Sequence, residues 1–341
     1  MKKAKNLLKI GAIYLGTVLG AGFASGQELV LFFVRFSRRG LLGCLIAGLL
    51  FCLLGSLVLS KAHGLAEKTY RNYLETVFGK RTAGFLAFVT EVFLCAGFCI
   101  MLSGSGAFFK ERLSLSPAIG ILVTDAICLA VFLGNLKGLS LVNLILAPIM
   151  IFGTLYVSLY TILTDCQPAW LPQVSSHGRF LPYAFFYVGY NMLTAAAVLV
   201  PASAIAENAK TAARGGVLGG AVLTLMAVLC SVALFLTEEV WSGALPMLLL
   251  AEHAGSFAYI LYSMVLYMAM LTTAVSTGFS VVERMHQAGA GRIYAAFSVC
   301  FLAIPLSFVE FSVLVGHCYV FFGVLGILLV GGILWDWYKR L

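Results

Sequence analysis

Four glycines, a glutamine and a glutamate interrupt the first long apolar run of this 341-residue chain. The run extends from Leu7 to Val34, and its middle, from Gly16 to Glu28, reads GTVLGAGFASGQE. A run of this length can cross a bilayer, which takes about 20 residues. However, each interior glycine weakens a helix by about 1 kcal/mol, and a glutamate in hydrocarbon costs considerably more. The pattern therefore predicts a transmembrane helix that is broken near mid-membrane and binds a ligand there.

The two helix ends at such a break offer different chemistry. Each end leaves amides or carbonyls without partners. The amides after the break favour an anionic group, and the carbonyls before it favour a cation. The predicted solute site comprises Gly20, Ala21, Gly22, Phe23, Ser25 and Glu28. Close packing of small residues is the alternative explanation for the glycines, but it does not account for the polar pair Gln27 and Glu28.

A second run with polar groups at mid-span lies near the middle of the chain. Residues 185–192 read FFYVGYNM, and Pro201 follows. We expect a second helix break here, with Phe186, Tyr187, Tyr190 and Asn191 lining the same solute site. An aromatic belt at the membrane interface is the alternative, but the mid-span position of these residues argues against it.

Hydroxyl side chains follow one side of a later apolar run. They are Thr272, Thr273, Ser276, Thr277 and Ser280, at helical spacings of three and four. Two of these hydroxyls and three backbone carbonyls would form an oxygen cage suited to a sodium-sized cation. The alternative is that each hydroxyl bonds to a carbonyl of its own helix.

Four acidic residues fall at or near membrane depth, where an ionisable group is a functional candidate by default. Glu28 could pair with a solute ammonium or carry a coupled proton if burial raises its pKa, and Glu91 could do the same from a facing helix. Asp125 is interpreted as structural. Glu207 is interpreted as part of a solvated helix end.

The composition requires a polytopic membrane protein. Hydrophobic residues make up 61% of the chain and charged residues 11%, against about 25% charged in a soluble domain. The net charge of +8 is attributed to basic residues at the membrane borders. No nucleic-acid partner is therefore expected, and membrane lipid is the expected neighbour. The nine cysteines fit neither a zinc site nor a disulfide framework. Ten spans are predicted: 7–34, 41–60, 82–109, 117–133, 139–163, 180–205, 215–236, 255–282, 293–309 and 311–335.

The loop charges predict the orientation. With ten spans, 16 of the 22 Lys and Arg residues fall on the side of the termini, which places both termini in the cytoplasm of a cell-membrane protein. The cluster Arg35–Arg39 opposes this bias. The polar segment 61–81 is expected to be a helical loop, and the loop 164–179, with Pro168, Trp170 and Pro172, is expected to lie at an interface.

The two interrupted spans, one and six, hold matching places in two five-span halves, 7–163 and 180–335, of one transport domain covering 1–341. An odd number of spans per half forces the halves into opposite orientations. Broken segments at matching places in inverted halves indicate a transporter's midplane binding site.

These features resemble a known family. Five plus five spans with breaks in the first and sixth resemble the LeuT fold of the amino acid–polyamine–organocation superfamily. The segment GAGFASGQE, residues 20–28, resembles the YkvI-like bacterial membrane proteins. The fold class implied is an all-α protein of ten transmembrane helices with an inverted repeat.

The resemblance also implies site residues. The spacing of Gly16, Leu19, Gly20 and Gly22 matches the first helix of the sodium-coupled neurotransmitter-transporter branch. The match implies a sodium ion held by the carbonyls of Gly16, Leu19 and Ala269 and the hydroxyls of Thr272 and Thr273.

The match with that branch has two departures. Gly189 replaces the branch's serine in the sixth helix, and Phe93 and Phe98 stand where its third helix has a tyrosine.

The function predicted is a secondary active transporter that moves a small, amino-acid-like solute with a sodium gradient, without a cofactor. One alternative is a proton-coupled carrier that uses Glu28 or Glu91. Another is a ligand sensor on a transporter scaffold, such as a germinant-receptor-like subunit. An enzyme is not expected, because the chain has no metal-ligand motif, nucleophile elbow or P-loop. The oligomeric state is left open.

Overall fold

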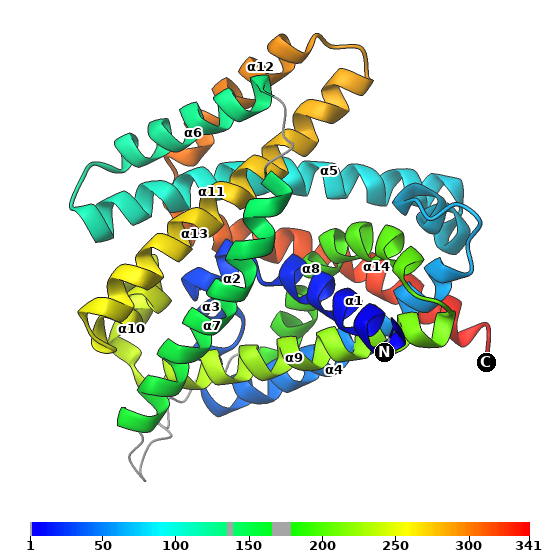
Figure 1. Ribbon diagram of the computed structural model, residues 1–341, viewed down its shortest axis with the longest axis horizontal. Helices are drawn as coiled ribbons and strands as arrows, with labels where there is room; N and C mark the ends of the chain where they lie inside the picture. The colour runs from blue at the N-terminus through cyan, green and yellow to red at the C-terminus, as the bar shows by residue number, and fades with distance from the viewer. Residues whose placement is uncertain (1, 135–138, 166–178) are drawn as a thin grey trace.

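The computed structural model describes residues 2–134, 139–165 and 179–341, and every regular element in these ranges is a helix (Figure 1). The helices follow the order α1 (Lys2–Val18), α2 (Ala21–Ser25), α3 (Gln27–Phe32), η1 (Val34–Phe36), α4 (Ser37–His63), α5 (Tyr70–Leu113), α6 (Pro117–Leu133), α7 (Leu139–Asp165), α8 (Phe180–Ala202), η2 (Ser203–Ile205), α9 (Ala209–Leu236), η3 (Glu238–Ser242), α10 (Pro246–His253), α11 (Ser256–Gln287), α12 (Arg292–Ser307), α13 (Phe311–Leu314), η4 (Val315–Tyr319) and α14 (Val320–Tyr338).

The ten predicted spans correspond to helical segments of the described chain. Six helices are long and apolar enough to cross a membrane, and three shorter apolar helices accompany them: 117–133, 148–164 and 292–307. The segment 61–81 is helical only in part: α4 ends at His63, and α5 begins at Tyr70 and kinks at Gly79, which has a φ of 76°. The predicted interfacial loop around Trp170 lies outside the described residues.

The break in span one is present. Helix α1 ends at Val18, and Leu19 and Gly20 are not helical before α2 begins at Ala21. A second interruption follows at Gly26, whose φ of 82° lies in the left-handed region that favours glycine. The glycine-rich sequence thus divides one span into three helices, of 17, 5 and 6 residues.

The break expected in span six is absent, so that prediction is wrong. Helix α8 runs without interruption from Phe180 to Ala202. Gly189 has another role, because a Cβ there would overlap the carbonyl oxygen of Gly323 on α14, and one at Gly326 would overlap the backbone of Gly189. This glycine therefore lets two helices touch through their backbones. Such close packing is the role that the sequence analysis gave as the alternative for the glycines of span one.

The helices form two groups (Figure 1). Helices α1, α4, α8, α9 and α14 pack together, whereas α5, α6, α11 and α12 pack in a second group, and α7 contacts both α9 and α11. Glycines on two faces of α9 organise the first group: Gly215 and Gly219 face α1, and Gly216 and Gly220 face α4. Helix α1 packs on α9 and α8, whereas α2 packs on α11. The break in span one therefore lies between the two groups.

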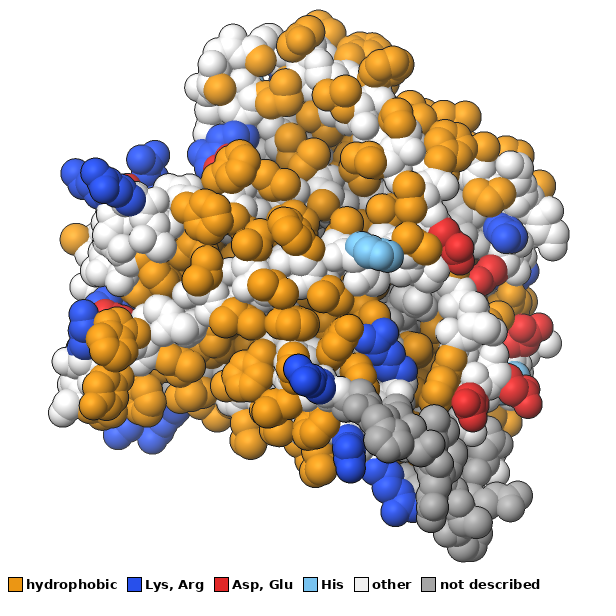
Figure 2. Space-filling model, turned by 180° about the vertical axis from the view of Figure 1, so that it is seen from behind, with side chains coloured by type: hydrophobic (Ala, Val, Ile, Leu, Met, Phe, Trp, Pro, Cys, Tyr) orange, Lys and Arg blue, Asp and Glu red, His pale blue; other side chains and the backbone are white. Residues whose placement is uncertain are grey.

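The surface fits a protein embedded in a membrane. Apolar side chains cover most of the face shown in Figure 2, whereas Lys and Arg lie at its left edge and in its lower centre, and most of the acidic side chains in view lie at its right edge. Large apolar residues such as Leu49, Phe301 and Phe152 are exposed on the protein surface.

Two glycines of α14 give a matched stability test. Gly326→Ala should lower the midpoint of thermal unfolding in detergent, because overpacking costs about 1–3 kcal/mol and the obstacle is the backbone of Gly189. Gly331→Ala should raise it, because no atom lies within 4 Å of the added Cβ and alanine gains about 1 kcal/mol in a helix interior. Equal shifts in the same direction would contradict the α8–α14 contact.

Candidate functional site

The break in span one leaves backbone groups without backbone partners. In the described chain, no backbone carbonyl accepts a hydrogen bond from the amides of Ala21, Gly22 or Phe23, and no backbone amide donates to the carbonyls of Gly16 or Leu19. The amide of Gly20 donates instead to Val18 O, at 2.9 Å. The break thus presents donors on one side and acceptors on the other, as its sequence predicts.

Glu28 lies directly against this break. Its side chain is buried, with 5% exposed, and a Cβ on Gly22 would overlap its Oε1. The hydroxyl of Tyr190 donates a hydrogen bond of 2.6 Å to Glu28 Oε2. The sequence placed both residues in one site, and the structure brings them into contact.

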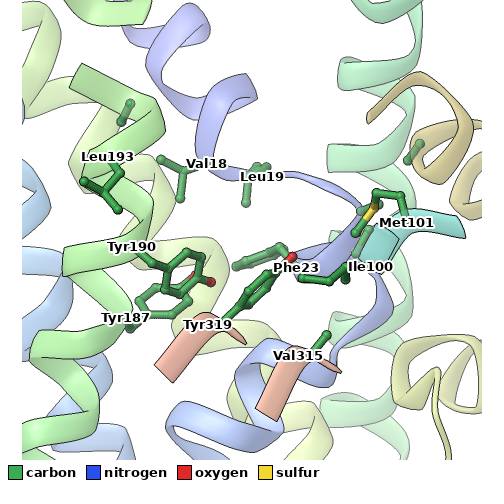
Figure 3. Packing of buried hydrophobic residues seen from close by; sticks show 14 of the residues in the cluster. Val18, Leu19, Phe23, Ile100, Met101, Tyr187, Tyr190, Leu193, Val315 and Tyr319 are labelled. Atoms are coloured by element: carbon green, nitrogen blue, oxygen red, sulfur yellow. The ribbon is translucent and has the colours of Figure 1, made fainter. Parts of the chain in front are cut away.

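Aromatic rings surround this carboxylate. Tyr190 stacks on Tyr319, with ring centroids 4.6 Å apart, and on Phe32 at 5.6 Å. Phe93 presents its edge to both tyrosines, with each centroid 5.9 Å away. Figure 3 shows Tyr187, Tyr190, Tyr319 and Phe23 converging on the chain between Val18 and α2. We call Phe32, Phe93, Tyr190 and Tyr319 the aromatic box.

The remaining predicted residues of span six take different positions. Tyr187 is buried against Phe33 and Tyr190, and its hydroxyl has no hydrogen-bond partner among the described residues. Asn191 donates to Tyr187 O within its own helix, at 2.9 Å. The Phe186 side chain packs against Gly323 of α14, away from the break.

Ser25 shapes the turn that follows α2. Its hydroxyl donates to Gly22 O at 2.7 Å and accepts from the amide of Gln27 at 3.2 Å. Both contacts hold the chain where it enters α3.

The residues predicted to bind sodium lie on two helices that pack on different neighbours. Gly16 and Leu19 end α1, which packs on α9 and α8, whereas Ala269, Thr272 and Thr273 are on α11. The Thr272 hydroxyl donates to Ala269 O of its own helix, at 3.2 Å. Gly16 is exposed, and no atom lies within 4 Å of a Cβ built there. The structure therefore does not assemble these five groups into one cage.

Glu91 lies outside the Glu28 site. Its carboxylate forms an ion pair with Arg284 of α11. Both side chains are partly exposed, which separates Glu91 from the buried carboxylate.

Three residues that contact the site were not predicted from the sequence. Tyr319 ends η4, a π-helical turn within span ten, and such turns occur often at functional sites. Tyr262 of α11 donates a 2.6 Å hydrogen bond to Ala24 O. Met247 of α10 packs against Gly26. In the sequence, only the mid-span position of Tyr319 could have indicated its role. The contacts of Tyr262 and Met247 join residues far apart in the chain, so no local pattern predicts them.

Comparison with known proteins identifies the fold. No protein-family model matches the chain. It is 28% identical over 331 residues to the uncharacterized membrane protein YkvI of Bacillus subtilis (strain 168), covering 96% of this chain and 94% of the relative. The resemblance to YkvI-like membrane proteins is confirmed. A second relative, the uncharacterized protein YyaD of Bacillus subtilis (strain 168), is 23% identical and covers 93% of both chains.

Solved structures show the same architecture as this chain. The inward facing conformation of Mhp1 superposes with a TM-score of 0.69 at 13% identity, over 98% of this chain and 76% of that one. MhsT in complex with L-phenylalanine superposes with a TM-score of 0.66 at 14% identity, over 95% of this chain and 87% of that one. Both are transporters, not enzymes, and have the LeuT fold. The all-helical LeuT-like fold is therefore confirmed.

The contact between Gly22 and Glu28 can be tested by a double-mutant cycle. Gly22→Ala should lower the midpoint of thermal unfolding, because the new Cβ displaces the carboxylate and overpacking costs about 1–3 kcal/mol. In the Gly22→Ala/Glu28→Ala variant the loss should be smaller than the sum of the single losses, because the methyl group fills vacated space. Gly20→Ala is the control, since no atom lies within 4 Å of its Cβ. Additive losses would contradict the contact.

Proposed function

We propose that this chain is a secondary active transporter that moves a small, amino-acid-like solute across the cell membrane by alternating access, coupled to a sodium gradient. The observation that carries the proposal is the break in span one, where unpaired backbone groups and the buried Glu28 meet. Backbone groups left unpaired at membrane depth are tolerated only where they bind something or line a cavity.

The two-group architecture supports alternating access. The half of span one before the break, α1, packs on α9 and α8, whereas α2 packs on α11 and α10. A rocking of one group against the other would therefore change the surroundings of Leu19 and Gly20. The domain proposed is a single one, 1–341, with inverted halves 7–163 and 180–335.

Sodium coupling is proposed from the oxygen atoms at the end of α1. The carbonyls of Gly16 and Leu19 have no amide partner in the described chain, and Gly16 borders open space. In the proposed cycle α1 closes onto α11, and the carbonyl of Ala269 and the hydroxyls of Thr272 and Thr273 complete the cage. The Na⁺-coupled sialic acid symporter, with a TM-score of 0.62, has the same fold.

The proposed orientation places both termini in the cytoplasm, from the distribution of Lys and Arg.

Uptake into proteoliposomes tests sodium coupling. A mixture of radiolabelled amino acids should accumulate with an inward sodium gradient and not when potassium replaces sodium. Thr272→Ala and Thr273→Ala should each raise the sodium concentration for half-maximal uptake about tenfold, because a polar contact to a charge contributes about 1.5–3 kcal/mol. Ser280→Ala is the control, since its exposed hydroxyl bonds only to Ser276 O. Amino-acid uptake that is the same with and without sodium would contradict the coupling. Saturable amino-acid binding without uptake would favour a ligand sensor.

A proton-coupled carrier is the second candidate, and Glu28 favours it. A buried carboxylate that receives a single tyrosine hydrogen bond is suited to exchanging a proton during transport. Under this mechanism a pH gradient alone should drive uptake, and Glu28→Gln should abolish that uptake while retaining solute exchange. A sodium-driven uptake that survives in Glu28→Gln would exclude Glu28 as the coupling group.

A further inference from the structure

A group of arginines lies at the membrane border opposite the N-terminus. Six Lys and Arg residues fall on that side of the ten-span arrangement, and four of them form this group, which we call the arginine cluster: Arg35, Arg38, Arg39 and Arg179. Cytoplasmic loops normally carry the excess of basic residues, so the cluster opposes the proposed orientation. The transport proposal gives these four residues no role.

Two neighbouring helices bring the cluster together. Arg38 and Arg39 lie in the first turn of α4, and Arg179 directly precedes α8. The Phe180 side chain of α8 packs against Gly43 of α4, with its Cδ2 3.1 Å from a Cβ built on that glycine. The basic ends of the two helices therefore lie at the same border of the protein.

Arg35 joins the cluster from the turn that ends span one. Its guanidinium carbon lies 4.4 Å from the ring centroid of Tyr183 on α8 and 4.9 Å from that of Phe36. Stacking on ring faces orients a guanidinium and leaves the N–H groups at its edge to donate to an anion. The end of span one thus presents a hydrogen-bond donor beside α8.

The chain supplies no acidic neighbour in sequence for this positive charge. It has no Asp or Glu between residues 29 and 66 or between residues 166 and 206. Arg39 and Arg179 are exposed and form no ion pair with a described residue. Basic side chains in the first turn of α4 also oppose its helix dipole, whose positive end lies there. An anion from outside the chain would offset both unfavourable terms.

An exposed apolar stripe continues from the cluster along α4. Leu42, Leu45 and Leu49 follow Arg38 at spacings of four, three and four residues, which places all four on one face of the helix. The three leucines, which we call the leucine stripe, are 56%, 46% and 70% exposed. Basic groups at headgroup depth beside apolar side chains at acyl-chain depth match the two parts of an anionic phospholipid. A free phosphate would leave the stripe without a partner.

We propose that the arginine cluster and the leucine stripe bind an anionic phospholipid of the phosphatidylglycerol type, in the leaflet opposite the N-terminus. Arg38 and Arg39 hold the phosphate, because a guanidinium binds phosphate through two parallel hydrogen bonds. Arg35 connects the bound headgroup to the end of span one through its stacking on Tyr183. This lipid site does not depend on which solute the protein moves.

The test compares lipids that differ only in their headgroup. The purified full-length protein in detergent is titrated with dioleoylphosphatidylglycerol or dioleoylphosphatidylcholine, and its midpoint of thermal unfolding is measured. A ligand that binds the folded protein raises this midpoint by mass action. We expect phosphatidylglycerol to raise it more than phosphatidylcholine does. Glycerol 1-phosphate, which carries the phosphate without acyl chains, should not raise it.

Variants assign the effect to the cluster, with lipid affinity measured by native mass spectrometry. Arg38→Gln/Arg39→Gln should weaken phosphatidylglycerol binding about tenfold, because charge-assisted hydrogen bonds to the phosphate are lost. Arg38→Lys/Arg39→Lys should weaken it about threefold, because lysine keeps the charge without the bidentate geometry. Lys68→Gln/Arg71→Gln is the matched control: it removes two charges from a segment where Arg71 pairs with Glu75, and binding should stay within about twofold.

Each outcome supports or overturns the lipid site. Equal stabilisation by the two lipids would overturn it, as would equal losses of affinity in the Arg38→Gln/Arg39→Gln variant and the control. Stabilisation by glycerol 1-phosphate that is lost in Arg38→Gln/Arg39→Gln would indicate a site for free phosphate esters and would also overturn it. If the double variant does not fold, Arg39→Gln alone decides, and undiminished phosphatidylglycerol binding in that variant would contradict the proposal.

Discussion

A carboxylate at membrane depth must be compensated, and the centre of this structure is arranged around that constraint. Glu28 is compensated by one tyrosine hydrogen bond and by its position against an unwound stretch of backbone. Gly22 must lack a side chain for that position, and Gly26 must adopt a left-handed φ for α3 to carry Glu28 back toward the break. The buried charge and the broken helix therefore depend on each other.

Glycine serves two opposite purposes in this chain, and the sequence alone does not distinguish them. Gly16 and Gly20 border open space, in the last turns of α1 and at the break, whereas Gly189 and Gly326 let two intact helices touch through their backbones. All four glycines sit in apolar spans. The difference lies in what faces each glycine, which is a property of the neighbouring helix.

Because such differences depend on neighbouring helices, the sequence predicted features within one segment better than contacts between segments. Hydrophobic runs located the spans, and the glycine cluster located the break in span one, because both signals lie within a single segment. The break expected in span six is absent, since α14 supplies the partner that explains Gly189. Tyr319 lies 291 positions after Glu28 in the chain, and its π-helical turn has no local sequence signature. Glu28 and Tyr190 were predicted together because each is a polar residue at mid-span.

The attachments of span one indicate where motion must be absorbed. Helix α1 is fixed to α9 by close contacts at Gly215 and Gly219, whereas α2 is fixed to α11 by the hydrogen bond from Tyr262 to Ala24 O, at 2.6 Å. Any displacement of one helix group against the other must therefore change the backbone at Leu19 and Gly20, which carry no helical hydrogen bonds across the break. A ligand that bridges this junction would interact differently with the two arrangements, and such a difference is what allows binding to shift a conformational equilibrium.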